Sequence, residues 1–389
     1  MYVKITDNVK YIGVDDTSLD LFESQYVIPD GVSYNSYVIL DEKVAVIDTV
    51  DERGMKEWEE NLMLVLEGKD VDYLVIQHLE PDHAGGILRM RELFPEITLI
   101  GNQKTFLFLS QFMKESEAWK TQVVKEKEEL SLGKHTLSFH MATMVHWPEV
   151  MVTYDKTEQI LFSADAFGKF GALEATEEDD WACEARRYYF NIVGKYGVAV
   201  QSLLAKMKEL DIQMICPAHG PILQAPLAEY VELYDTWSRY EPETKGVLIA
   251  YGSFHGNTRE AAELLAQKLR AQGEQEVVLR DLAREDMAEV IEDAFRYDRM
   301  VLAAASHDAG VFPQMKDFLH RLQSKGYQNR KVAIVENGTW SPSAGRIMRE
   351  LLETMKNIEI VEPMVTIRST LNEEDVVLLQ ELAENTRIG

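Results

Sequence analysis

Four possible metal ligands fall within six residues in the stretch Gln77-His78-Leu79-Glu80-Pro81-Asp82-His83. An apolar run at 73–76, typical of a buried strand, precedes this stretch, and a Gly-Gly pair that opens a predicted helix follows it. Alternate side chains of an extended chain point to the same side, so His78, Glu80 and Asp82 can converge. Pro81 cannot donate a hydrogen bond to a neighbouring strand and is expected to mark the end of this one. The pattern therefore predicts a metal site at the end of a strand.

The size and charge of the chain exclude several classes of protein. With 389 residues, the chain is too long for one ordinary core, and we expect two domains. Its 66 acidic and 40 basic side chains give a formal net charge of -26, which argues against binding to nucleic acid or to an anionic membrane surface. No apolar run approaches the roughly 18 to 20 residues that span a bilayer, and the start lacks a signal-peptide core. The two cysteines, Cys183 and Cys216, form no C-x-x-C pair, so we expect a cytoplasmic protein.

The sequence pattern changes near Pro242. Before it, short β-rich runs come first and helical segments follow from about residue 177 to 210, the pattern of two sheets between helical layers. After it, strands and helices alternate, with strands expected at 246–251, 276–280, 300–305, 332–336 and 358–365. Five alternating strands predict a doubly wound parallel sheet. We therefore predict an α+β domain at residues 1–243 and an α/β domain at residues 246–389.

Three more predicted strand ends carry side chains of the same chemistry as the opening stretch, namely His146, Asp165 and His219. A rigid scaffold can direct side chains at such positions into one cleft. Together the candidate metal ligands are His78, Glu80, Asp82, His83, His146, Asp165 and His219. We interpret three other histidines as structural residues: His135, His140 and His320.

This set resembles the metallo-β-lactamase superfamily, whose pattern H-x-H-x-D-H is followed by a distant His, Asp and His. Glu80 stands where the zinc hydrolases of that superfamily carry a histidine. An anionic oxygen in place of a neutral nitrogen favours iron over zinc. If Asp165 bridges, each metal can take two histidines and two carboxylates: His78, Glu80, His146 and Asp165 on one, and Asp82, His83, His219 and Asp165 on the other.

The pattern H-x-E-x-D-H and the second half of the chain are similar to the flavodiiron protein family over essentially the whole length. The runs His146-Trp147-Pro148 and Ser163-Ala164-Asp165-Ala166-Phe167-Gly168 add to the resemblance. It implies an N-terminal αββα metallo-β-lactamase-like sandwich and a C-terminal flavodoxin-like doubly wound parallel sheet. It also implies two non-haem iron ions bridged by Asp165, bound FMN, and reduction of dioxygen to water, of nitric oxide to nitrous oxide, or of both. Many relatives carry a further pocket histidine near the N-terminus, and residues 21–26 contain none.

Three loops of the second half are candidates for FMN binding. The first follows the first strand and opens a helix, whose backbone N–H groups can bind phosphate while Ser253 and Thr258 add hydroxyl donors. The other two follow the third and fourth strands, at the sheet edge where open sheets place ligands. Trp340 could stack on the isoalloxazine ring or serve as a core residue. The candidate FMN-binding residues are Ser253, Phe254, His255, Gly256, Asn257, Thr258, Ser306, His307, Asp308, Ala309, Gly310, Asn337, Gly338, Thr339, Trp340 and Ser341.

The resemblance also implies partners. No four-cysteine rubredoxin module follows the second half, so we expect an external electron donor such as rubredoxin or a reductase. We further expect a head-to-tail homodimer, or a dimer of such dimers, in which each flavin faces the partner's metal site. One alternative is a dinuclear zinc hydrolase of esters or thioesters fused to a flavodoxin domain, and Glu80 is the residue that distinguishes it. Another is a flavin electron carrier with an inactive metal domain, which the complete ligand set disfavours.

Two charged stretches have ordinary structural explanations. The acidic run Glu177-Glu178-Asp179-Asp180 suits the first turn of a helix, where carboxylates interact favourably with the helix dipole. A basic stretch before the fourth strand is interpreted as a solvated loop; it contains Arg321, Lys325, Arg330 and Lys331.

Overall fold

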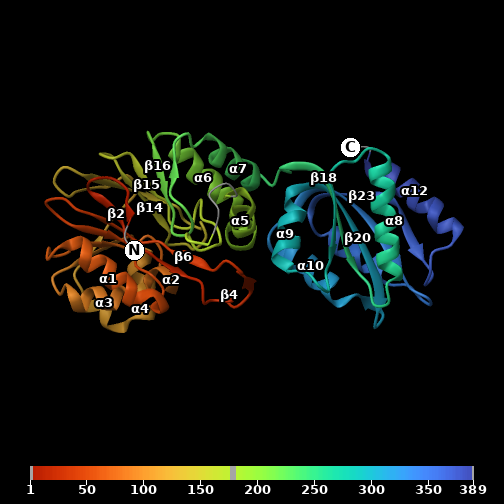
Figure 1. Ribbon diagram of the computed structural model, residues 1–389, viewed down its shortest axis with the longest axis horizontal. Helices are drawn as coiled ribbons and strands as arrows, with labels where there is room; N and C mark the ends of the chain where they lie inside the picture. Colours follow the sequence, from red (N-terminus) through yellow and green to blue (C-terminus); the bar gives the residue numbers. More distant parts are fainter. Residues whose placement is uncertain (1–2, 176–180, 388–389) are drawn as a thin grey trace. The chain divides into compact units, whose positions relative to one another are not determined.

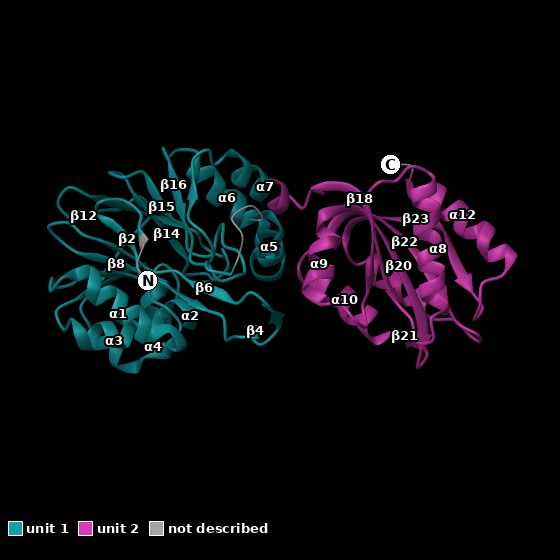
Figure 2. Cartoon of the chain, in the orientation of Figure 1, with its two compact units in different colours: residues 1–235 teal, residues 236–389 magenta. Residues whose placement is uncertain are grey.

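The computed structural model describes residues 3–175 and 181–387, and the chain forms two compact units, Met1–Asp235 and Thr236–Gly389 (Figure 2). The division falls within helix α7 (Ala228–Ser238). The boundary predicted at 243–246 coincides with the start of strand β18 (Thr244–Gly252), and we retain it as a proposal. The acidic run at 177–180 lies outside the described residues.

Two mixed sheets form the frame of the described part of unit 1. The first has the order β1-β2-β7-β8-β9-β10-β11, with bounds Val3–Lys4, Val9–Tyr11, Tyr37–Ile39, Ala45–Ile47, Tyr73–Val75, Thr98–Gly101 and Thr121–Val123. The second runs from β12 to β17 in sequence order, with bounds Glu129–Ser131, Thr136–Met141, Met151–Asp155, Ile160–Phe162, Met214–Cys216 and Leu223–Gln224. Two short ribbons pair β3 (Val14–Asp16) with β6 (Val32–Tyr34), and β4 (Leu21–Phe22) with β5 (Tyr26–Val27).

The core of unit 1 lies between the two sheets. Ile47 and Val75 from the first sheet belong to the same buried cluster as Phe139 and Phe162 from the second. Figure 1 shows α1, α3 and α4 on the side of unit 1 opposite α6 and α7, so helices cover the outer faces. Their bounds are Met55–Leu66, Ile87–Leu93, Gln103–Phe112, Gly197–Met207 and Ala228–Ser238, and α2 (Pro81–Ala84) and α5 (Trp181–Tyr188) complete the set. This confirms the predicted αββα sandwich.

The opening stretch differs from its prediction in one respect. Strand β9 ends at Val75, and Pro81 is the first residue of helix α2, where its fixed φ and missing N–H suit a helix start. Asp82 and His83 therefore belong to a helical turn and not to an extended chain. The candidate ligands converge because a loop and a helix start follow the strand, and strand alternation is not the cause.

Unit 2 contains the predicted doubly wound sheet. Its five main strands pair in parallel in the order β19-β18-β20-β22-β23, which is the flavodoxin-like order. The bounds of β19 to β23, including the short β21, are Val277–Asp281, Tyr297–His307, Gly310–Val311, Gln328–Asn337 and Lys356–Ile367. Helices α8 and α12 lie on one face and α9 and α10 on the other (Figure 1). The helices α8 to α12 span Asn257–Ala271, Met287–Arg296, Pro313–Ser324, Ala344–Leu352 and Glu373–Arg387.

Arg330 corrects the prediction of a solvated basic loop. It lies near the start of β22, and only 2% of the residue is exposed. Its guanidinium donates hydrogen bonds to the backbone carbonyls of Tyr240 at 2.7 Å, Tyr297 at 2.8 Å and Phe295. A planar guanidinium has five donors, so one buried arginine can satisfy several carbonyl groups at a strand start. Arg330 therefore stabilises unit 2 from inside.

Candidate metal centre and ligand pocket

The seven candidate metal ligands come together in two adjacent groups in unit 1. Within each group, possible ligand atoms lie within 4.8 Å of one another. The first group has a mixed nitrogen and oxygen set and consists of His78, Glu80, His146 and Asp165. The second consists of Asp82, His83 and His219. Loops after β9 and β16 and the start of α2 supply most of these side chains, so distant segments meet at one end of the two sheets.

Asp165 lies between the two groups and directs one carboxylate oxygen toward each. Its Oδ2 atom is 3.4 Å from Nε2 of His78 and 3.3 Å from Nε2 of His146. Its Oδ1 atom is 3.2 Å from Nε2 of His83 and 3.7 Å from Nε2 of His219. A carboxylate in this position has the geometry required to bridge two cations.

Hydrogen bonds on the far side of two rings hold their Nε2 atoms toward the centre. The Nδ1 atom of His78 lies 2.8 Å from Oε1 of the fully buried Glu149, and Nδ1 of His219 lies 2.7 Å from the carbonyl oxygen of Ser33. Such partners fix the ring orientation and leave Nε2 free to bind a metal. Glu149 directly follows the run at 146–148 but was not predicted as a site residue, because its partner His78 lies 71 residues away.

The electrostatics of the site fit bound cations. Both carboxylate oxygens of Asp82 and Nε2 of His219 are buried without a hydrogen-bond partner among the described residues. Although burial lowers it, the pKa of His78 is raised to about 10 by Asp165, Glu149 and Glu80. Burial also lowers the pKa of His83, but Asp82 and Asp165 raise it to about 9. The cluster therefore attracts positive charge, and unpaired buried ligand atoms would be satisfied by a metal.

Aromatic side chains enclose the second group. The hydroxyl of Tyr188, at the end of α5, donates a hydrogen bond to Oδ1 of Asp165 at 3.1 Å. The next five residues form a π-helix (Tyr189–Val193), a rare element that often occurs at functional sites. The Phe22 ring meets His219 edge-on, with ring centroids 5.5 Å apart. Of the two tyrosines that follow one another here, Tyr188 contacts the cluster and Tyr189 packs against Tyr234 with ring centroids 5.1 Å apart.

A pocket of about 230 Å³ opens onto Glu80 and Asp82. Its lining includes Leu19, Leu21, Phe22, Glu23, Ser24, Tyr34, Asp51, Arg53 and Pro81. Glu23 lines this pocket together with Glu80; its side chain as a whole is solvent exposed, and its carboxyl group is partly buried. Burial of that carboxyl and the nearby charge of Glu80 raise the pKa of Glu23 to about 7. The pocket gives a small molecule access to the candidate ligands.

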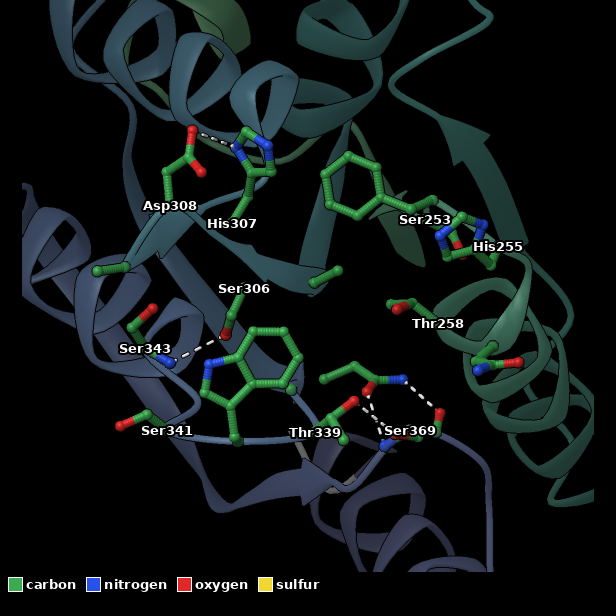
Figure 3. Close-up of a pocket in the computed structure, with 17 residues that line it drawn as sticks. Ser253, His255, Thr258, Ser306, His307, Asp308, Thr339, Ser341, Ser343 and Ser369 are labelled. Carbon is green, nitrogen blue, oxygen red and sulfur yellow. Dashed lines mark hydrogen bonds and ion pairs between the residues drawn. The ribbon is translucent and has the colours of Figure 1, made fainter.

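A second pocket, of about 280 Å³, lies at the carboxyl edge of the sheet in unit 2 (Figure 3). Its lining contains fourteen of the sixteen candidate FMN-binding residues: Ser253, Phe254, His255, Asn257, Thr258, Ser306, His307, Asp308, Ala309, Asn337, Gly338, Thr339, Trp340 and Ser341. Gly256 and Gly310 do not line it. Gly256 adopts φ +96° at the start of α8, a conformation that favours glycine, and so shapes the loop.

The pocket is polar at its loops and aromatic on its walls. Trp340 is 81% exposed and lines the pocket, which excludes the alternative of a core tryptophan. The rings of Phe254 and His307 lie 5.1 Å apart between their centroids on the same lining. The hydroxyl of Ser306 accepts a hydrogen bond from the backbone N–H of Ser343 at 2.9 Å, which joins two of the three loops. An open slot with one exposed indole and several hydroxyls suits a planar aromatic ligand that carries a phosphate.

The sequence analysis missed three residues of this lining: Ala305, Ser343 and Ser369. Ser369 comes from a fourth loop, after β23, and its hydroxyl lies 2.6 Å from that of Thr339. The rule that ligands bind at the carboxyl ends of parallel strands applies equally to the fifth strand. The position of Ser369 after a predicted strand therefore indicated a pocket residue from the sequence alone.

Comparison with known proteins agrees with both halves of the structure. A family described as ODP family beta lactamase matches residues 32–220, and a flavodoxin domain matches residues 248–362. The structure of rubredoxin oxygen:oxidoreductase from Desulfovibrio gigas has a TM-score of 0.93 and 26% identity, over 99% of this chain and 98% of that one. The chain has the domain composition of the flavodiiron proteins, a metallo-β-lactamase-like domain and a flavodoxin domain.

Other relatives match over nearly the same length. A nitric oxide reductase from Moorella thermoacetica is 29% identical over 98% of this chain and 96% of its own. The flavodiiron protein from Giardia intestinalis shares the fold, with a TM-score of 0.93, 23% identity and coverage of 99% and 97%. These matches favour a flavodiiron oxidoreductase over the zinc hydrolase alternative. Among the described residues, no helix has both the length and the apolarity required to cross a membrane.

Proposed function

We propose that this flavodiiron protein reduces dioxygen to water, nitric oxide to nitrous oxide, or both, at a diiron site that receives electrons from FMN. The main support for this proposal is the position of Asp165, whose two carboxylate oxygens face two separate groups of histidines. Similarity to a rubredoxin oxygen:oxidoreductase and to a nitric oxide reductase supports both gases as substrates.

In this proposal the chain holds two irons with the seven candidate ligands. His78, Glu80 and His146 would hold one, Asp82, His83 and His219 the other, and Asp165 would bridge them. Bound iron would supply electrons and open coordination positions for a gas molecule, and FMN would store electrons from a donor. Reduction of dioxygen to two waters needs four electrons and four protons, and coupling of two nitric oxide molecules to nitrous oxide and water needs two of each.

The protein side chains have separate roles around this site. Glu149 and the Ser33 carbonyl orient two ligand rings, and Tyr188 orients the bridging carboxylate through its hydroxyl. Phe22 meets His219 edge-on and would help to exclude bulk water, which would keep a reacting gas enclosed. The role of the chain is to position ligands and to control access.

We propose that the pocket of unit 2 binds FMN. Backbone N–H groups at the start of α8, with Ser253 and Thr258, would hold the phosphate, as at other helix starts. Trp340 would stack on the isoalloxazine ring, because it is exposed and lines the slot. The loops around Ser306, Asn337 and Ser369 would surround the remaining edge of the ring system.

Metal content, flavin content and gas consumption test this proposal together. Protein produced with iron should contain about two irons per chain, as a two-metal site requires, and should release flavin on denaturation. With a chemical reductant and each gas supplied separately, the wild type should consume at least one gas, and Asp165→Ala should not. Stoichiometric zinc with hydrolysis of an ester or thioester would overturn the proposal in favour of a hydrolase.

We further propose a cytoplasmic protein with an external electron donor, such as rubredoxin or a reductase, and a head-to-tail homodimer or dimer of dimers. The name of the Desulfovibrio gigas protein supports a rubredoxin-type donor. Exposed apolar side chains near each site, Trp340 and Phe254 in unit 2 and Leu21 and Val27 in unit 1, support contact with another protein surface.

Mixing two inactive variants tests the dimer. Asp165→Ala removes the bridging ligand, and Gly256→Trp blocks the phosphate loop. In a head-to-tail dimer of one chain of each kind, one intact flavin faces one intact metal site. Random co-assembly should therefore restore about a quarter of wild-type gas reduction. Mixed dimers that form and remain inactive would show that electrons pass within one chain.

A further inference from the structure

Two hydroxyl groups on separate loops of the unit 2 pocket form a close pair. The hydroxyls of Thr339, after β22, and of Ser369, after β23, lie 2.6 Å apart, and both residues line the pocket (Figure 3). A hydroxyl has one O–H donor and can accept two hydrogen bonds. The contact between the two groups uses one O–H, so the second O–H remains for another acceptor and the donating oxygen keeps its lone pairs. The pair therefore offers a ligand both a donor and an acceptor.

Asn337 fixes the position of this pair. Its side chain donates a hydrogen bond to the Ser369 carbonyl at 2.9 Å and accepts one from the Ser369 backbone N–H at 3.1 Å. Asn337 is buried, and Ser369 has a φ angle of +72°, in the left-handed region that non-glycine residues rarely adopt. Such conformations concentrate at ligand sites, where the surrounding structure enforces them. Asn337 is therefore a positioning residue that holds the Ser369 hydroxyl against that of Thr339.

The loop that carries Ser369 opens beside the loop expected to hold the phosphate. Helix α8 begins at the phosphate loop and α12 begins soon after Ser369, and the two helices lie on the same face of the sheet (Figure 1). They are in contact, because Lys268 of α8 donates a hydrogen bond to the Gln380 side chain of α12 at 3.1 Å. Both helices start at the carboxyl edge of the parallel sheet, so their first turns are neighbours. Since Trp340 directly follows Thr339, a ligand that extends from the start of α8 to Trp340 passes the hydroxyl pair.

We propose that the Thr339–Ser369 pair binds the sugar-alcohol chain of the flavin, between its phosphate and its ring. The inference rests on the proposed FMN site and specifies which side chains recognise the middle of the ligand. The ribityl chain carries a row of hydroxyl groups, each both a donor and an acceptor, and so matches a pair that offers one of each. A site built to bind ligand hydroxyls discriminates against an analogue without them, because its own polar groups are then left unpaired.

Three flavins that share the ring and differ in the side chain test the proposal. FMN carries the chain and the phosphate, riboflavin carries the chain alone, and lumiflavin has only a methyl group in its place. Flavin-depleted, full-length protein is titrated with each, and binding is followed by the change in flavin fluorescence. Thr339→Val keeps the shape of threonine but removes the hydroxyl. We expect this variant to bind FMN and riboflavin about threefold to tenfold more weakly, and lumiflavin less than about twofold more weakly.

Further variants separate the hydroxyl from other effects. Thr339→Ser keeps the hydroxyl and should bind all three flavins like the wild type. Ser369→Ala should reproduce Thr339→Val. Asn337→Ala should weaken the same two ligands and spare lumiflavin, because it releases the Ser369 loop. The control Ser324→Ala removes a hydroxyl at the end of α10 and should leave the affinity for each flavin unchanged.

An equal loss of affinity for all three flavins in Thr339→Val and Ser369→Ala would overturn the proposal, because it would show that the pair contacts the ring or supports the pocket as a whole. Unchanged affinity for riboflavin in both variants would overturn it too. If no flavin binds to the wild type, the proposed FMN site is itself wrong, and the inference fails with it. The flavin series thus distinguishes a failure of the inference from a failure of the proposed function.

Discussion

Removal of the Glu149 carboxylate should weaken metal binding although Glu149 itself binds no metal. Its Oε1 atom lies 2.8 Å from Nδ1 of His78 and accepts a hydrogen bond from the backbone N–H of Leu79 at 3.1 Å. The backbone of Glu149 is fixed in turn by Asn102, whose side chain donates to the Glu149 carbonyl at 2.5 Å. These bonds hold the His78 ring in the orientation that presents Nε2 to the centre.

The expected loss of stability follows from the hydrogen-bond donors that the substitution leaves without an acceptor. Glu149→Leu leaves two buried donors without an acceptor, at a cost of about 1 to 3 kcal/mol each in the free energy of unfolding. Loss of such an orienting partner typically weakens metal affinity about 10- to 100-fold, or roughly 1.4 to 2.8 kcal/mol. Glu149→Gln keeps a neutral acceptor and should lose less, about threefold to tenfold, because charged acceptors bond more strongly.

Competition with a chelator of known affinity measures these losses, with iron retained by the protein determined by elemental analysis. Glu60→Leu, at an exposed position of α1, is the matched control and should retain metal like the wild type. Circular dichroism of each variant checks that unit 1 is folded. If Glu149→Leu is folded and retains iron as well as the wild type, Glu149 does not position His78 for metal binding.

Three other changes test separate parts of the chain. The carboxylate of Asp155 accepts a hydrogen bond from Nδ1 of His135 at 2.7 Å and raises the pKa of His135. The stability lost in His135→Asn should therefore be largest below about pH 6.5 and should shrink as pH rises through the raised pKa, measured by urea unfolding at several pH values. Arg330→Met should lower the stability of unit 2 by about 3 kcal/mol or more, followed by thermal release of flavin fluorescence. The control Arg321→Met, at a partly exposed position, should lower it much less. Trp340→Ala should weaken FMN binding about tenfold in a fluorescence titration without loss of stability, because the side chain is exposed.

The alternation of strands and helices, and the positions of the strand ends, could be predicted from the sequence for physical reasons. Buried parallel strands are short apolar runs, and side chains that follow them meet at one edge of a sheet. For this reason the doubly wound parallel sheet of unit 2 was predicted and is confirmed. The same rule brought His146, Asp165 and His219 into the candidate set, and the structure places them together.

Predictions from local sequence patterns were wrong where contacts between distant residues determine the structure. Pro81 suits a strand end and a helix start equally well, and only the tertiary structure shows that it begins α2. Arg330 lies in a basic stretch that is typical of a solvated loop, yet carbonyl groups from Phe295 and Tyr240 enclose it. Partners that lie 35 to 90 residues away leave no periodic signal near the residue itself.

The hairpin tip shows why a pocket cannot be described by the residue types of its family alone. The sequence shows only that residues 21–26 lack the histidine that many relatives carry. The structure adds that Glu23 lies in a left-handed turn and lines the same pocket as Glu80. An imidazole is either neutral or positive and a carboxyl group is either neutral or negative, so the two residues differ in the charge that they can bring to the pocket. The charge that this pocket can carry therefore depends on the residues of one turn as well as on the candidate metal ligands.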